Sequence, residues 1–120
     1  MRFLMTYDSA DHGPPDPEKM AAIARFTEEM MASGALVDTG GMLPVSQGAR
    51  VKVAGGAFTV TDGPFPETKE VVLGYAIVKV ASKEEAIDLA RRFMLIAGDG
   101  EGEIRQLMGP ADEPHHQPHR

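Results

Sequence analysis

The stretch Val71-Val72-Leu73-Gly74-Tyr75-Ala76-Ile77-Val78-Lys79-Val80 is the strongest strand signal in the chain. Its apolar residues fall on both alternating faces, which is typical of a strand in the middle of a sheet. Ser82-Lys83-Glu84-Glu85 follows at once, and a Ser three residues before a Glu predicts a capping box at a helix start. A central strand followed by a helix therefore decides the second half of the fold.

The helix after Ser82 carries apolar residues at helical spacing, so we expect one of its faces to be buried. The predicted buried stripe consists of Ala86, Leu89, Ala90 and Phe93. The glycines within residues 98–102 end this helix, and residues 103–108 are expected to form a last strand. The second half of the chain therefore has the order strand, helix, strand.

The first half repeats this order. Residues 2–7 alternate as a strand, and Asp16-Pro17 predicts a helix start with Asp as the cap and Pro at the first helical position. The helix continues to Ser33, and Gly34 ends it. Residues 35–43 then form a second extended segment, which we expect Gly40-Gly41 to interrupt.

A hairpin is predicted between the two halves. Residues 50–53 and 58–61 alternate apolar and polar side chains around Gly55-Gly56, and a primed two-residue turn needs positive φ at both centres. Two βαβ halves are typical of a ferredoxin-like α+β sheet, which we expect over residues 1–110 as one domain. Its helix-free face carries apolar residues, so we expect a homodimer with the sheets face to face.

Residues 62–70, Asp-Gly-Pro-Phe-Pro-Glu-Thr-Lys-Glu, lie between the hairpin and the central strand. They combine two Pro, one Gly, one aromatic residue and four charged residues. Pro lacks an amide donor and Gly favours turns, so this mixture suits neither a helix nor a central strand. The stretch therefore marks either a shaped turn that fixes the fold or the wall of a site.

Composition excludes several classes of protein. A net charge of −6 with scattered Lys and Arg argues against direct binding of nucleic acid. The apolar runs are too short to span a membrane, and the N-terminus does not resemble a signal peptide, so we expect a cytoplasmic protein. The absence of Cys excludes thiol nucleophiles, disulfides and Cys-based zinc sites.

Residues 60–70 resemble the signature of the DGPF branch of the YCII-related family. Further similarity lies at residues 1–8, 26–30, 33–37, 73–75 and 84–86, so the resemblance covers roughly residues 1–110. It implies a dimeric α+β barrel built from ferredoxin-like subunits. This agrees with the fold that the element order predicts.

The resemblance implies two different functions. Relatives by fold include isomerases and monooxygenases that work without a bound cofactor in a pocket between sheet and helices. DGPF proteins also resemble partners of extracytoplasmic-function sigma factors, which implies a role in transcription initiation. The His-Asp catalysis suggested for the YCII branch cannot be carried over, because the first helix of this chain contains no His.

The candidate catalytic residues are Asp62, Glu67 and Tyr7, and the candidate ligand-binding residues are Asp8, His12, Pro64, Phe65, Lys69 and Glu70. Two carboxylates in one pocket can divide the acid and base roles. Alternatively, Asp62 caps a turn, and Glu67 forms an ion pair with Lys69. Tyr7 either donates a hydrogen bond to a ligand or is a half-buried packing residue.

Histidine offers two further candidates. His12 is the only His outside the tail, and it is either a general base or an idle residue of an exposed loop. His115, His116 and His119 lie in residues 111–120, which we expect to form a disordered His-rich tail. The spacing of these tail histidines could bind a divalent metal weakly, but we expect no metal site because a disordered tail lacks the fixed geometry that one needs. We expect no cofactor, and the chain has neither a phosphate loop nor a dinucleotide fingerprint.

Two functions stay open on the sequence alone. The first is small-molecule binding or cofactor-free proton transfer of the isomerase or lyase type, in a pocket near residues 62–70, with Asp62 or Glu67 as the base and Tyr7 as the donor. The second is a regulatory interaction protein associated with a sigma factor. The sequence does not decide whether the protein is an enzyme.

Overall fold

The computed structural model describes residues 1–11, 13, 16–43, 47–62 and 73–109. Along the chain the elements are β1 (Arg2–Ser9), α1 (Pro17–Ser33), β2 (Leu36–Met42), β3 (Ala49–Ala54), β4 (Ala57–Asp62), β5 (Leu73–Lys79), α2 (Lys83–Ala97), β6 (Gly100–Glu101) and β7 (Ile104–Gln106). The predicted order of strands and helices is confirmed. Residues 111–120, and with them the predicted tail, lie outside the described residues.

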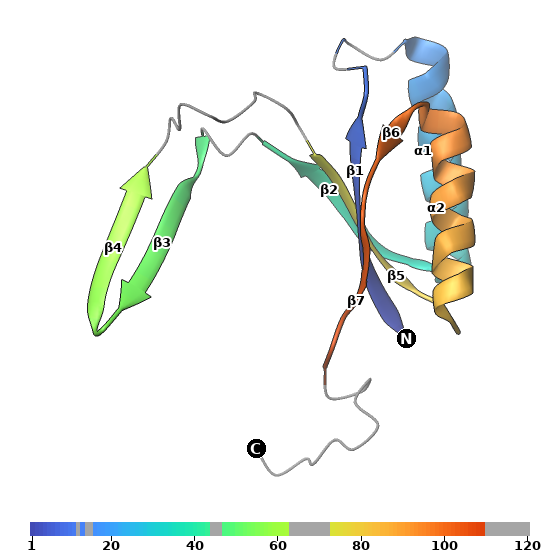
Figure 1. Ribbon diagram of the computed structural model, residues 1–120. Coiled ribbons are helices and arrows are strands. Elements are labelled where there is room, and N and C mark those ends of the chain that lie inside the picture. Colours follow the sequence, from blue (N-terminus) through green and yellow to red (C-terminus); the bar gives the residue numbers. More distant parts are fainter. Residues whose placement is uncertain (12, 14–15, 44–46, 63–72, 110–120) are drawn as a thin grey trace.

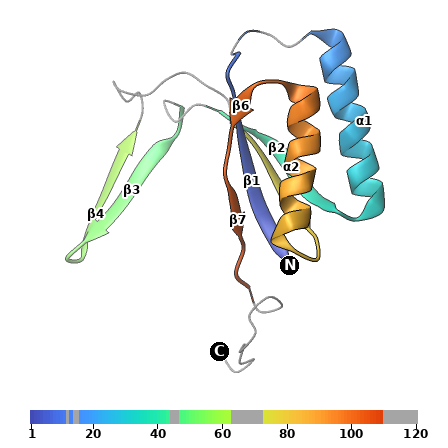
Figure 2. The same cartoon turned by 45° about the vertical axis from the view of Figure 1, so that its right-hand side comes forward.

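The main sheet is antiparallel, with β5 and β1 in the middle, β2 on one edge, and β6 and β7 on the other. Both helices lie on the same face of this sheet (Figures 1 and 2). This is the α+β arrangement of a ferredoxin-like fold, and it confirms the predicted fold class. Neither helix of the described part is long and apolar enough to cross a membrane.

The helix ends follow the local chemistry that the sequence predicts. The Asp16 carboxylate accepts a hydrogen bond from the Lys19 amide at 2.7 Å, and Pro17 opens α1. Gly34 ends α1 in the left-handed conformation, with φ of 84°. The Ser82 hydroxyl caps α2 by accepting from the Glu85 amide at 3.2 Å.

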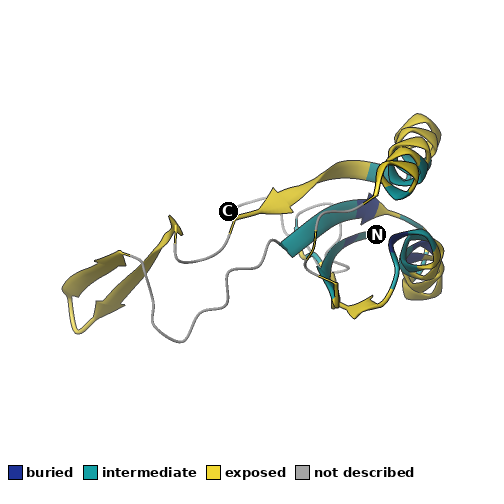
Figure 3. Ribbon diagram, turned by 90° about the horizontal axis from the view of Figure 1, so that it is seen from above, coloured by how far each residue is buried: buried dark blue, intermediate teal, exposed yellow. Residues whose placement is uncertain are grey.

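The core lies where α2 crosses the middle of the sheet. Its buried residues are Phe3, Val78, Ala86 and Leu89, and Met5, Phe26, Met30, Ala35, Leu36, Val80 and Ile104 pack against them. The predicted stripe of α2 is confirmed, since Ala86 and Leu89 are buried and Ala90 and Phe93 are half-buried. In Figure 3 the buried and half-buried segments gather in the sheet and on the helices that cover it.

The predicted hairpin forms a separate two-stranded sheet of β3 and β4. Its turn residues Gly55 and Gly56 have φ of 56° and 83°, as a primed turn requires. Every residue from 49 to 62 is exposed, and the hairpin stands apart from the main sheet (Figures 1 and 3).

Two strand details differ from the sequence prediction. Gly40 and Gly41 do not interrupt β2, which pairs with β5 through both; the irregularity in register falls between Leu36 and Asp38. Glycine suits position 40 because a Cβ atom there would lie only 3.0 to 3.2 Å from side-chain atoms of Tyr75. The glycine-rich stretch after α2 also contains a strand, β6, which pairs with the end of β1.

Gly102 allows the chain between β6 and β7 to approach β1 closely. A Cβ at this position would overlap the Thr6 carbonyl oxygen. Two hydrogen bonds between Thr6 and Glu103 hold the chain in this position. The Thr6 amide donates to the Glu103 carbonyl at 3.0 Å, and the Glu103 amide donates to the Thr6 hydroxyl at 3.1 Å. The edge of the sheet therefore depends on a residue without a side chain.

Gly102→Ala is expected to lower the free energy of unfolding by about 2 kcal/mol, because the new methyl group forces this edge away from β1. Gly74→Ala is the matched control, since its methyl group would lie 3.8 Å from the Tyr7 carbonyl oxygen, an ordinary contact. Urea unfolding followed by circular dichroism measures both variants. Wild-type stability of Gly102→Ala would contradict the close approach.

Candidate functional site

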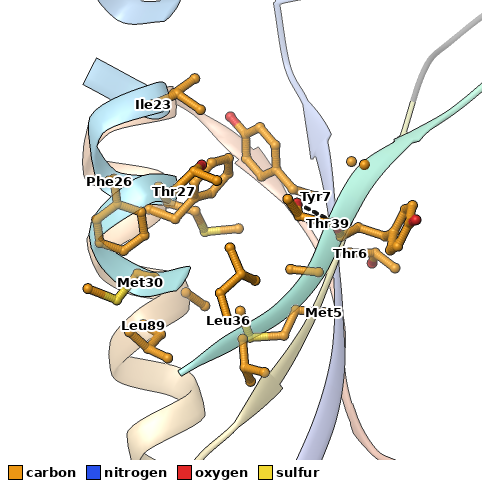
Figure 4. Close-up of a pocket in the computed structure, with 18 residues that line it drawn as sticks. Met5, Thr6, Tyr7, Ile23, Phe26, Thr27, Met30, Leu36, Thr39 and Leu89 are labelled. Atoms are coloured by element: carbon orange, nitrogen blue, oxygen red, sulfur yellow. Dashed lines mark hydrogen bonds between the residues drawn. The ribbon is translucent and has the colours of Figure 1, made fainter. Parts of the chain in front are cut away.

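A cavity of about 340 Å³ lies between the sheet and the two helices. It is lined by Met5, Thr6, Tyr7, Ile23, Phe26, Thr27, Met30, Leu36, Thr39, Gly40, Gly74, Tyr75, Ala76, Val78, Leu89, Ala90, Phe93 and Met94. Figure 4 shows side chains of α1 and α2 on one side of it and side chains of β1 and β2 on the other. Two layers of secondary structure thus enclose the cavity.

The cavity exists because large residues of the sheet stand beside small ones. On the helix-facing side of the sheet, Met5 of β1 is opposite Ala76 of β5, and Tyr7 is opposite Gly74. On the other edge of β5, Thr39 of the neighbouring strand β2 is paired with the same Ala76. Since Ala and Gly fill little space, the sheet is hollow over this part of β5, below α1 and α2.

Tyr7 joins the cavity wall to the end of α2. Its hydroxyl donates to the Gly98 carbonyl at 2.8 Å and lies 3.1 Å from the Asp99 carbonyl oxygen. Its ring meets the Phe93 ring edge to face, with centroids 5.2 Å apart. Tyr7 therefore packs on the end of α2, and the proton of its hydroxyl is already donated to the backbone.

The two helices are also linked above the cavity. The Arg92 guanidinium of α2 lies 5.2 Å from the centre of the Phe26 ring of α1, within the range of a cation–π contact. Phe26 lines the cavity from α1. A change in the distance between the helices would therefore alter both this contact and the cavity.

The described lining suits an uncharged ligand. None of its residues carries a formal charge, and its polar side chains on the helix-facing side are Tyr7, Thr27 and Thr39. Thr6 and Tyr75 border it only from the other face of the sheet. The Thr39 hydroxyl is engaged with the Tyr75 carbonyl at 2.8 Å (dashed in Figure 4). Polar groups are few in an otherwise apolar wall, which is the usual composition of a small-molecule site.

The structure separates the predicted site residues. Tyr7 lines the cavity, whereas Asp8, the next residue of β1, is half-buried and belongs to the alternate face of the sheet. Asp62 ends β4 on the exposed hairpin and is not among the described residues of the lining. The other candidates lie outside the described residues: His12, Pro64, Phe65, Glu67, Lys69 and Glu70.

Comparison with known proteins places the chain in a family. Residues 1–109 match the YCII-related domain. The chain belongs to the YCII-related family. It is also similar to an uncharacterized protein of Rhizobium meliloti (strain 1021), with 33% identity over 76 residues, and the match spans 63% of this chain and 61% of that protein. That relative's description states no activity.

The sequence of this YCII-related chain predicted a pocket near residues 62–70, but not which residues of the helices line the cavity. Leu89 and Phe93, which line it from α2, were expected in the buried stripe of that helix. The available signal was the sequence Gly74-Tyr75-Ala76, which places two small residues on the same face of a central strand. Only the packing of the helices on the sheet shows that the space above these two residues is unfilled.

Tyr7→Phe is expected to lower the free energy of unfolding by about 1 kcal/mol, because it removes the hydrogen bond to Gly98 and keeps the ring contact with Phe93. Tyr75→Phe is the control, since no hydrogen bond of its hydroxyl is found among the described residues. The urea concentration at the unfolding midpoint measures the stability of both variants, provided that the denaturant slope of the free energy of unfolding is unchanged. An equal effect of the two substitutions would contradict a specific role of the Tyr7 hydroxyl.

Proposed function

We propose that this protein binds an uncharged, mainly apolar small molecule in the cavity between the sheet and the helices. The observation that carries the proposal is the cavity itself: about 340 Å³ beside a core of few buried residues. This volume lies within the roughly 300–1,000 Å³ of small-molecule sites. Methionines at 5, 30 and 94 line it, and their flexible side chains adapt to ligands of different shape.

We further propose that the chain is of the DGPF branch and that its signature serves this site. The signature, residues 60–70, precedes β5, the strand that lines the cavity at Gly74 and Ala76. Glu70 is four residues from Gly74, so their Cα atoms are separated by at most about 14 Å. The length of the chain therefore limits how far the Glu70 carboxylate can lie from Gly74, which lines the cavity.

If the site is catalytic, the reaction we propose is cofactor-free proton transfer, as in an isomerase or lyase. The described lining has no carboxylate, and we propose that the signature supplies the base, with Asp62 and Glu67 as the candidates. Tyr7 can accept a hydrogen bond from a ligand as it stands. It can donate one only by exchanging its bond to the Gly98 carbonyl.

We also propose a homodimer that covers the helix-free face of the sheet. By strand alternation this face carries Leu4 of β1 together with Tyr75 and Ile77 of β5, and both pairs Leu4–Ile77 and Thr6–Tyr75 are in register. Leu4, Tyr75 and Ile77 are only half-buried within a single chain, so a second sheet could still cover them. A sedimentation mass of one chain at micromolar concentration would contradict this. Association with a sigma factor stays a prediction of the resemblance.

Binding in the cavity is tested with N-phenyl-1-naphthylamine, an uncharged aromatic probe whose fluorescence rises in apolar surroundings. The wild type should bind it at micromolar concentration. Ala76→Leu fills the hollow over β5, so the probe should bind at least tenfold more weakly, about 1.4 kcal/mol, while thermal stability is kept or raised.

The matched control is Ala24→Leu, which adds the same atoms on the exposed side of α1 and should leave probe binding unchanged. Fluorescence that survives in Ala76→Leu would mean that the probe binds elsewhere, for example on the exposed hairpin. That result would overturn the cavity as the binding site.

Asp62→Asn tests the catalytic part of the proposal. Asp62 is exposed at the end of β4, so the substitution should change the free energy of unfolding by less than about 0.5 kcal/mol. Proton exchange at an acidic carbon of a bound ligand, followed by deuterium incorporation, should then fall at least a hundredfold. Unchanged exchange would remove Asp62 as the base, and a large loss of stability would instead assign it to the turn.

A further inference from the structure

The β3–β4 hairpin has one apolar and one polar face. The register pairs Val51 with Val60 and Val53 with Phe58, so these four side chains lie together on one face. The opposite face carries Arg50, Lys52, Thr59 and Thr61. Such a division is typical of a strand pair that packs on another surface with one face only.

The apolar face is uncovered within a single chain. Val51, Val53, Phe58 and Val60 are 61, 64, 68 and 54% exposed. Adjacent on one ribbon, they form a contiguous patch, and on soluble monomers a patch of more than a few hundred Å² marks an interaction site. A two-stranded hairpin is also marginally stable by itself in water, so its packing partner contributes to its folding.

The position of the hairpin indicates what covers it. Figures 1 and 3 show the hairpin on the side of the main sheet opposite to the helices, beyond the face that carries Leu4, Tyr75 and Ile77. Whatever packs on that sheet face therefore enters the space beside the hairpin. The two apolar surfaces belong to the same side of one molecule.

We propose that the hairpin is an arm that packs its apolar face on a second copy of this chain. In a twofold assembly each chain would give one arm and receive one, so that the same two surfaces are buried twice. The polar face with Lys52 and Thr59 then remains in water. The inference rests on the homodimer proposed above and adds a specific contact to it.

The surface of the chain is large enough for such an assembly. All residues of the hairpin, from 49 to 62, are exposed, so its apolar face is available for contact. A standard interface needs about 800 Å² from each partner, which the arm and the open sheet face can supply together.

The test exchanges Val and Thr, which have nearly the same shape, on the two faces of the arm. The triple variant Val51→Thr, Val53→Thr and Val60→Thr makes the apolar face polar and keeps residues of high strand propensity. The control, Thr59→Val with Thr61→Val, changes the opposite face. Analytical ultracentrifugation over a dilution series gives the dimer Kd of each, and circular dichroism verifies that each is folded.

The expected result is a dimeric wild type, a dimer Kd at least tenfold higher for the triple variant, and an unchanged Kd for the control. A monomeric wild type would overturn both the homodimer and the arm. Ile77→Lys, on the sheet face, separates the two proposals: if it dissociates the dimer and the triple variant does not, the homodimer stands and the arm contact is wrong.

A second measurement does not depend on the stability of the arm. The chain contains no Cys, so a single introduced Cys can be labelled at one site with a benzophenone photocrosslinker. Val53→Cys on the apolar face should give covalent dimers on irradiation, and Lys52→Cys on the polar face should give few. Equal yields from the two adjacent positions would overturn the proposal.

Discussion

The antiparallel pairing of β1 with β5 is the constraint on which the rest of this structure depends. Its register runs from Arg2 opposite Lys79 to Tyr7 opposite Gly74. A shift by one residue would move Phe3 and Val78 out of the core and bring Leu4 and Ile77 into it. The same register sets Met5 beside Ala76, so the core, the open face and the cavity all follow from one ladder.

Most of the fold could be predicted because local chemistry and tertiary structure agree. Asp16, Pro17 and Gly34 bound the first helix, and Ser82 starts the second, as their side chains or conformations require. β6 could not be predicted in the same way. Gly100 and Glu101 have no strand propensity of their own, and their pairing with β1 comes from the close approach that the glycines of this segment permit.

The site was less predictable than the fold. Tyr7 was a candidate because of its place at the end of a strand, and it does line the cavity, yet its hydrogen bond to Gly98 joins residues far apart in sequence. Asp62 was a candidate because its carboxylate can act as a base. The presence of a carboxylate in the sequence does not indicate how far it lies from a cavity. A cavity is made by what neighbouring elements leave unfilled, as at Ala76, and no single segment encodes that.

The position of β1 has a consequence for synthesis of the protein. This central strand leaves the ribosome before the other elements of the sheet, but its hydrogen bonds between Thr6 and Glu103 span 97 residues. At about 5–20 residues per second, the face with Phe3 and Met5 waits about 5 to 20 s for its last neighbour. The hairpin is local and can close in about 1–10 μs. The hairpin can thus close from its own residues, whereas the face of β1 with Phe3 and Met5 stays open to aggregation or chaperones until β7 is made.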